Sequence, residues 1–259
     1  MADKEIKVIV IDERVADGRQ ISGAASPKQN QLLATILKRS KLEYFPSLAL
    51  VELQLGDVIY ESGQPIEFVY FPTNCIISLL NVMTSGASAE IAVIGNEGML
   101  GVSVVMGSDS TPSRAVVQSK GYAYRLRVAE LKKELEARTD VWVLTLRYTQ
   151  ALITQMSQTA ACNRHHSIDQ QLCRWLLLSL DRLRGNELAM TQELIANMLG
   201  VRREGVTEAA GRLQKAGIIQ YRRGQITVVD RARLEGLCCE CYAVVKRETD
   251  RLGSISVKP

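Results

Sequence analysis

The stretch from Met190 to Gly217 contains two short amphipathic patterns on either side of a single glycine. Thr191 is a suitable N-cap for the first pattern, QELIANML, and the second pattern runs from about Arg202 to Lys215. Gly200 lies between them, where a sharp turn needs a positive φ. The spacing predicts a helix-turn-helix, with inward positions at Leu194, Ile195, Met198, Leu199, Val206, Ala209, Ala210 and Leu213.

The residues after this motif indicate what it would bind. They read IIQYRRGQITVVD, which alternates as two strands around Arg222, Arg223 and Gly224 and predicts a hairpin wing. From Arg202 to Arg233 there are eight basic and three acidic residues, whereas the whole chain has a net charge of +4. A solvated basic face would explain the charge alone, but charge, wing and motif together predict binding to double-stranded DNA.

The exposed side of the second helix supplies the candidate base-reading residues. Arg203 could pair with a guanine through two hydrogen bonds, and Glu204 could accept one from a cytosine amino group. The wing arginines are placed to contact phosphates. The full set of candidate DNA-binding residues is Arg202, Arg203, Glu204, Thr207, Glu208, Arg212, Lys215, Arg222 and Arg223.

The first half of the chain has a different character. Residues 1–27 are rich in small and polar residues after a short apolar run and are interpreted as a tail. From Leu48 to Arg127 the sequence consists of short β-prone runs punctuated by glycine, which is typical of an antiparallel sandwich or barrel. We therefore expect a β-domain over residues 28–138.

Residues 139–163 predict one long helix, since they contain neither proline nor glycine. This helix would be apolar on two sides. One stripe is Val141, Leu144, Tyr148, Leu152, Gln155 and Thr159, and the other is Trp142, Leu146, Ile153, Met156 and Ala160. The first stripe could pack on its own β-domain and the second on a partner chain, which predicts a homodimer. A central helix buried within a monomer is the alternative.

The boundary to the DNA-binding domain is expected near residues 162–167. Ser167 and Gln170 form an S-x-x-Q capping box that would start a new helix. The predicted DNA-binding domain covers residues 164–236, and residues 237–259 form a C-terminal helical extension.

In this order of parts the chain resembles the Crp/Fnr superfamily of bacterial transcription regulators. The resemblance covers roughly residues 30–236 and is most specific in TQELIANMLGVRREGVTEAAGRLQKAGII. It implies an α+β fold with an N-terminal β-roll (a jelly-roll of the cyclic-nucleotide-binding type), a long dimerisation helix and a C-terminal winged helix-turn-helix. It also puts Arg203 and Glu204 on base-reading positions. Glu208 departs from the arginine of the cyclic-AMP receptor branch, so the operator sequence does not carry over.

The resemblance gives the β-roll the role of effector sensor. The matching segment is GNEGMLGVSVVMGSDSTPSRAVV, and the candidate effector-binding residues are Gly98, Met99, Arg114 and Ala115. Arg114 takes the place of the phosphate-binding arginine, although an ordinary surface strand residue is the alternative. Ala115 replaces the expected serine, and Met99 replaces the expected glutamate, while Glu97 comes one position early. With two hydrogen-bonding groups lost, the effector is predicted not to be cyclic AMP.

The cysteines allow a second sensing route. An iron–sulfur cluster of the N-terminal type is excluded, because no cysteine precedes Cys75. Cys238 and Cys241 would share a face if they lay on one helix, where they could bind a soft metal or form a redox pair with the neighbouring Cys239. Without a second well-spaced pair we predict buried reduced thiols and assign no metal site. Cys162, His165 and His166 are interpreted as a polar cap at the domain boundary, with a Cys-x-x-His metal-ligand set or nucleophilic catalysis as the alternatives. The cofactor stays unknown.

Together these features predict a homodimeric, sequence-specific DNA-binding transcription regulator that responds to an unidentified small-molecule effector, with RNA polymerase as a candidate partner. No acid/base pair or phosphate loop indicates an enzyme. Because no run approaches the ~20 apolar residues of a membrane span and no secretion signal is evident, we expect a cytoplasmic protein without a membrane partner. The alternatives are an effector-independent DNA-binding protein, and a redox or metal sensor that uses the C-terminal cysteines.

Overall fold

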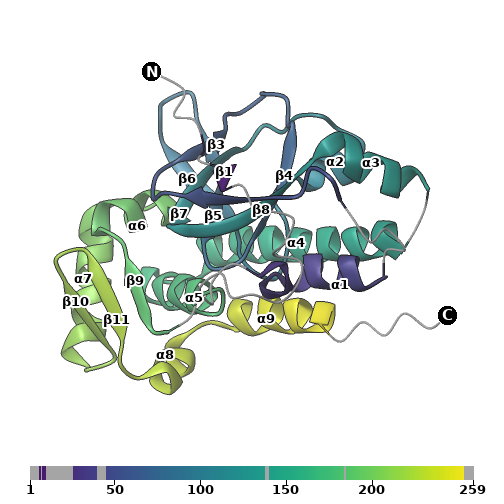
Figure 1. Ribbon diagram of the computed structural model, residues 1–259. Coiled ribbons are helices and arrows are strands. Elements are labelled where there is room, and N and C mark those ends of the chain that lie inside the picture. Colours follow the sequence, from purple (N-terminus) through teal and green to yellow (C-terminus); the bar gives the residue numbers. More distant parts are fainter. Residues whose placement is uncertain are drawn as a thin grey trace.

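The computed structural model describes Ile6 and residues 8–9, 26–39, 45–137, 140–183 and 185–253 (Figure 1). The predicted tail over residues 1–27 lies almost wholly outside these ranges. Within it, β1 (Val8–Ile9) pairs with β2 (Ala49–Leu53) at one sheet edge. The confirmed fold is α+β, with antiparallel sheets first and helices after them.

Two four-stranded antiparallel sheets form the β-roll. Their strand orders are β1-β2-β8-β4 and β3-β7-β5-β6. The strands not yet given are β3 (Val58–Tyr60), β4 (Phe68–Pro72), β5 (Ile76–Val82), β6 (Ser88–Ile94), β7 (Arg114–Ser119) and β8 (Gly121–Arg127). Leu53, Phe71, Ile77 and Ile94 lie fully buried between the sheets, as expected for β-rich runs that must cover each other. Short helices close the roll: α1 (Gln31–Arg39), α2 (Val102–Val105) and α3 (Val128–Glu136).

The long helix α4 (Asp140–His165) has a buried side and an exposed side. All six residues of the first predicted stripe are buried, including the polar Gln155 and Thr159. Gln155 is accommodated because its amide exchanges two hydrogen bonds with the backbone of Val93, at 3.1 and 3.0 Å. In the second stripe, Leu146 and Ile153 are exposed by 39% and 46%. The helix therefore packs on the roll and leaves an apolar strip uncovered.

The predicted helix-turn-helix is confirmed in its local details. Thr191 caps α6 (Gln192–Leu199) by accepting a hydrogen bond from the Leu194 amide, and Gly200 ends it with φ 67°. The recognition helix α7 (Arg203–Lys215) follows. The capping box of Ser167 and Gln170 starts α5 (Ile168–Leu180). The strands β9 (Glu187–Ala189), β10 (Ile219–Arg222) and β11 (Gln225–Val228) form the winged sheet in the order β10-β11-β9.

The DNA-binding domain is docked against the roll. Ile76, Leu80 and Val93 of the roll belong to the same apolar core as α5, α6 and α7. Buried hydrogen bonds cross the same boundary from α5: Trp175 Nε1 donates to Glu90 at 3.1 Å, and the Gln118 amide donates to the Ser179 hydroxyl at 3.2 Å. The two parts therefore share a mixed apolar and polar interface.

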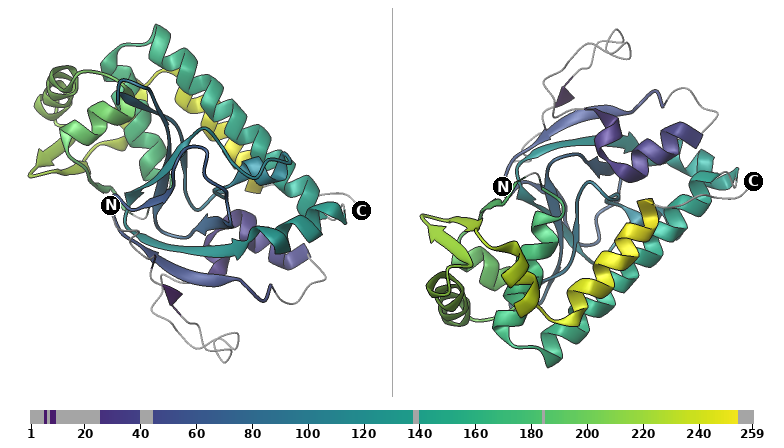
Figure 2. Two further views of the ribbon diagram at one scale, coloured as in Figure 1. Left: turned by 90° about the horizontal axis from the view of Figure 1, so that it is seen from above. Right: turned by 90° about the horizontal axis from the view of Figure 1, so that it is seen from below.

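The chain continues after the wing through α8 (Arg231–Leu237) and α9 (Glu240–Gly253). Figure 2 shows α9, in yellow, running alongside α4, and α9 also contacts α5. Tyr242 fixes the start of α9, because its hydroxyl lies 3.0 Å from Asp181 and accepts a hydrogen bond from Arg231 at 2.8 Å. Among the described residues, no helix is both long and apolar enough to cross a membrane.

Candidate nucleic-acid interface and effector site

Helix α7 presents its polar side to solvent because its apolar side is used for packing. Val206, Ala209, Ala210 and Leu213 are buried against the neighbouring helices. Every one of the nine candidate DNA-binding side chains is exposed: Arg202, Arg203, Glu204, Thr207, Glu208, Arg212, Lys215, Arg222 and Arg223. The fold therefore places the candidate DNA-binding residues on the surface of α7 and of the β10–β11 hairpin.

Four of these residues already have partners within the domain, and one of them, Glu208, lies 3.8 Å from Arg212. Arg212 makes a two-pronged ion pair with Asp169 of α5, with nitrogen–oxygen distances of 2.9 to 3.2 Å. The Thr207 hydroxyl lies 2.8 Å from the side-chain oxygen of Gln192. Arg203 is held only loosely, since its Nε is 4.0 Å from the Glu193 carboxylate. Arg212 therefore fastens α7 to α5, whereas Arg203 can turn outward.

The wing is fixed beside the start of α6. Met190 N–H donates to the Gly224 carbonyl at 2.7 Å, and the Tyr221 hydroxyl donates to the Met190 carbonyl at 3.2 Å. The turn itself needs two left-handed residues, Arg223 at φ 48° and Gly224 at φ 77°. Arg222 and Arg223 form no salt bridge within the described part of the chain, so both charges are available at the tip of the hairpin.

The four candidate effector residues do not line an open pocket. Gly98 is covered by the ring of Tyr148, because a Cβ at position 98 would lie 1.8 Å from that ring. Met99 and Ala115 are 0% exposed and belong to the core. Arg114 is partly exposed, and its Nε lies 3.0 Å from the Glu61 carboxylate. The structure therefore fills the expected effector position with Tyr148 and pairs the arginine with an acid.

Glu97 does not replace the missing ribose-binding glutamate. Its carboxylate accepts a hydrogen bond from Arg182 Nε at 2.8 Å and one from the Gly95 amide at 3.2 Å. Both side chains of the ion pair are almost completely buried, at 6% and 4% exposure. Arg182 follows α5, so this pair joins the loop after β6 of the roll directly to the domain that carries the helix-turn-helix.

Glu90 contributes a second buried carboxylate to this boundary. Burial raises its pKa to about 7, while hydrogen bonds from Ser78 and Trp175 and the charges of Arg174 and Arg182 oppose that rise. Sequence reasoning missed Glu90, Trp175 and Arg182 as functional candidates. Trp175 lies in an unbroken run of buried residues on α5, and this run gives no indication that acids of the roll face the helix.

A cleft of about 540 Å³ lies between the two parts of the molecule, away from the four candidate effector residues. It opens between turns of the roll and the winged sheet. Asn74 and Lys120 line it from the roll, and Glu187 and Gln225 line it from β9 and β11. Its walls come from both domains, so a molecule bound there would contact the roll and the winged sheet at once.

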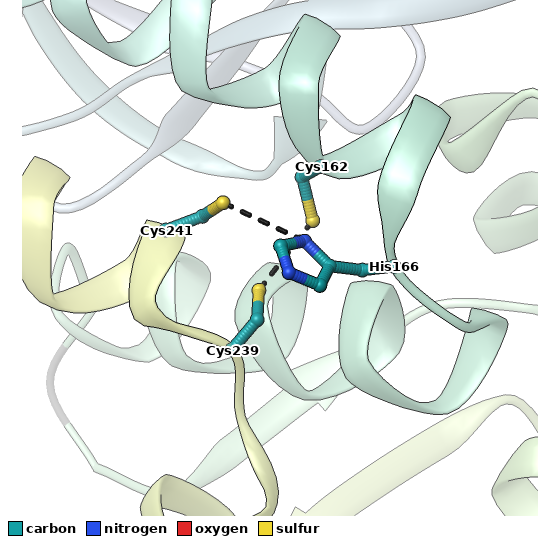
Figure 3. Close-up of side chains that lie close together, drawn as sticks. All are labelled: Cys162, His166, Cys239 and Cys241. Carbon is teal, nitrogen blue, oxygen red and sulfur yellow. Dashed lines mark hydrogen bonds between the residues drawn. The ribbon is translucent and has the colours of Figure 1, made fainter.

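The condition under which Cys238 and Cys241 would share a helix face is not met. Cys238 ends α8 with an extended backbone, and α9 begins only at Glu240. Instead Cys239 and Cys241 meet Cys162 and His166 from the end of α4 (Figure 3).

These thiols do not have the character of redox-active cysteines. Burial raises the pKa of the Cys162 thiol to about 11 and that of the Cys241 thiol to about 12. A reactive cysteine needs the opposite shift, since the thiolate is the nucleophile. Burial therefore favours the protonated thiols of Cys162 and Cys241 while these cysteines are free.

Comparison with known proteins agrees with this architecture. Residues 170–237 match a family model described as a Crp-like helix-turn-helix domain. The global nitrogen regulator of Synechocystis sp. is 24% identical over 210 residues, which are 77% of this chain and 92% of the relative. The solved structure of FixK2 from Bradyrhizobium japonicum matches with a TM-score of 0.60 and 18% identity, over 74% of this chain and 98% of that one. A putative Crp/Fnr-family transcriptional regulator from Eubacterium rectale matches with a TM-score of 0.61 and 19% identity, over 82% and 94%.

Proposed function

We propose that this chain is a transcription regulator of Crp/Fnr type, which binds operator DNA as a homodimer whose two α7 helices read two half-sites; the match of residues 170–237 to a Crp-like helix-turn-helix domain and the shared fold support this. The observation that carries the proposal is the exposure of all nine candidate DNA-contacting side chains on α7 and the wing. Regulators of this type are not enzymes, and we assign no catalytic residue.

The residues of the interface divide into two roles. Arg203 and Glu204 lie at the N-terminal end of α7, the part of a recognition helix that reaches base edges in the major groove. Arg202, Lys215, Arg222 and Arg223 contact phosphates and set the register of the protein on the duplex. Arg212 and Glu208 act mainly by shaping α7, because Arg212 is paired with Asp169 and lies 3.8 Å from Glu208.

The dimer forms through the uncovered side of α4. Leu146, Ile153 and Ala160 are spaced by seven residues and are all exposed, which is the pattern of one seam of a two-helix coiled coil. Pairing along this seam places two DNA-binding domains at opposite sides of a two-fold axis. Two α7 helices about 34 Å apart would enter successive major grooves.

An effector acts by changing how the DNA-binding domains sit on the rolls. The buried contacts of Arg182 with Glu97 and of Trp175 with Glu90 connect the two, so a ligand that favours one arrangement shifts DNA affinity. The effector is a small molecule other than cyclic AMP. Its action takes place in the cytoplasm, with RNA polymerase as a further partner.

Replacing Arg203 by alanine should relax base preference at one position of each half-site. Loss of a two-pronged contact to guanine costs about 1–3 kcal/mol of discrimination per half-site. The measurement is the affinity of wild type and variant for an operator and for its single-base substitutions. The matched control is the Arg222→Ala, Arg223→Ala variant, which should weaken binding to all these sequences equally and reduce the salt dependence. Equal weakening on every sequence by Arg203→Ala would show that Arg203 contacts phosphate only.

A further inference from the structure

Four potential metal ligands converge where α4 ends and α9 begins. Cys162 lies in the last turn of α4, and His166 follows four residues later on the same face, where its amide still donates to the Cys162 carbonyl at 3.0 Å. Cys239 precedes α9, and Cys241 lies in its first turn. Figure 3 shows the three sulfurs pointing toward the imidazole. All four ligand atoms lie within 4.8 Å of one another.

The spacing of the ligand atoms fits one tetrahedral ion. With Zn–S of about 2.3 Å and Zn–N of about 2.05 Å, tetrahedral geometry separates two sulfurs by about 3.8 Å and a sulfur from a nitrogen by about 3.6 Å. The Sγ atoms of Cys162 and Cys239 are 3.6 Å apart, and Cys241 Sγ is 3.7 Å from His166 Nδ1. The remaining pairs of ligand atoms would reach these separations after side-chain shifts of about 1 Å.

The surroundings of the histidine match those of a metal ligand. Its Nδ1 faces the sulfurs, while its Nε2 lies 3.4 Å from the Glu240 carboxylate. A ligating histidine commonly donates its second N–H to a carboxylate, which fixes the ring and its tautomer. The neighbouring His165 is exposed and takes no part.

The buried charge beside the cluster points to an anionic site. Arg174 is 4% exposed, its Nε has no hydrogen-bond partner, and it meets Thr159 through Nη1 at 3.1 Å. The structure gives it no ion pair with a carboxylate among the residues it describes. A divalent ion held by three thiolates and a neutral imidazole carries one net negative charge. Such a site would supply the counter-charge that a buried guanidinium requires.

We propose that Cys162, His166, Cys239 and Cys241 form a closed site for one Zn²⁺ ion per chain. Binding forms three Zn–S bonds and one Zn–N bond, and the three thiol protons leave to solvent. Three thiolates and an imidazole suit Zn²⁺, and the four protein ligands leave no open position, as in structural zinc sites. An iron–sulfur cluster does not fit, because its four protein ligands are distributed over two or four irons and must lie further apart than four ligands of a single ion. The ion fastens α9 to α4 at the junction with the DNA-binding domain.

The test uses the full-length protein, purified under reducing conditions, loaded with Zn²⁺ and desalted. We expect one zinc per chain by elemental analysis. Substitution by Co²⁺ should give the strong visible absorption of tetrahedral cobalt and a thiolate-to-cobalt charge-transfer band. Removing the ion with a chelator should increase hydrogen exchange in α9 and leave the wing strands β10 and β11 unchanged. The site is independent of the proposed DNA binding, which none of these measurements monitors.

Single variants assign the ligands. Cys239→Ser and His166→Ala should each lose stoichiometric zinc. Two control variants should retain stoichiometric zinc: Cys75→Ala, which removes a fully buried thiol of the roll, and Cys238→Ser, which lies next to the site. The proposal is overturned if loaded wild type holds no stoichiometric zinc, if its cobalt spectrum is octahedral, if it carries an iron–sulfur cluster, or if a Cys162–Cys239 disulfide forms in place of the metal. The wild-type cobalt spectrum decides the matter even if the ligand variants fail to fold.

Discussion

Replacing both Leu146 and Ile153 by glutamate should convert the dimer into monomers and lower operator affinity by about 10²–10⁴-fold. Both side chains are exposed on one chain, so their loss removes little packing within a monomer. In the paired helices they would meet their counterparts, where facing glutamates repel each other. A monomer binds one half-site at a time and loses the gain from linking two binding events. Size-exclusion chromatography with light scattering, together with operator titration, measures both effects.

The matched control for this variant lies on the same helix. Arg147 directly follows Leu146 and is rotated from it by about 100° around the helix axis. It is also exposed, so Arg147→Glu introduces the same new charge away from the seam. We expect this control to remain dimeric. If the double glutamate variant stays dimeric, the dimer interface does not include Leu146 and Ile153 of α4, and the proposed coiled-coil seam is wrong.

Replacing Arg182 by methionine should destabilise the protein by about 3–5 kcal/mol, the usual cost of leaving one member of a buried ion pair unpaired. Glu97 would remain at 6% exposure without its arginine. Adding Glu97→Gln should recover much of the loss, because a neutral amide tolerates burial better than an unpaired carboxylate. Urea denaturation of the wild type, the single variants and the double variant gives the coupling energy.

A second ion pair of similar geometry serves as the control for Arg182. Arg212 binds Asp169 through two nitrogens, but both side chains are largely exposed, at 57% and 41%. Because solvent screens such a pair, Arg212→Ala should cost about 1 kcal/mol or less. Equal losses for the two arginines would show that the boundary between roll and DNA-binding domain is not held by the buried pair.

The parts of the structure that follow local rules were predictable from sequence. Thr191 as N-cap, Gly200 with its positive φ and the Ser167–Gln170 capping box depend on residues within a few positions of each other. The two stripes of α4 followed from helical periodicity alone. Helix caps and turns depend on the backbone geometry of a few consecutive residues, so a short stretch of sequence is enough to predict them.

The parts that depend on distant residues were not predictable. Arg182 and Glu97 are 85 residues apart, and Cys162 and Cys239 are 77 apart. No local sequence pattern indicates that an acid after β6 contacts the arginine that follows α5. The convergence of the cysteines was missed for the same reason: CCECY spans the break between α8 and α9, and only the tertiary structure places Cys239 and Cys241 beside the end of α4.

The filling of the effector position is also a tertiary effect. The family resemblance pointed to Gly98 and Arg114, which lie on a loop and on β7 of the roll, but it could not show that Tyr148 covers the glycine. A ligand at this position must displace a fully buried tyrosine of α4, the helix that carries the proposed seam. This contact would link effector binding to the arrangement of the two chains.

The most direct test of the account is to select sequences from random double-stranded DNA with the full-length protein and to sequence the bound fraction. A homodimer that reads two half-sites should select a two-fold symmetric motif whose half-site centres lie about one helical turn, 10–10.5 base pairs, apart. Arg203→Ala should flatten one position in each half. Recovery of a single unpaired half-site, or of no motif at all, would contradict a homodimer that reads two half-sites with its α7 helices.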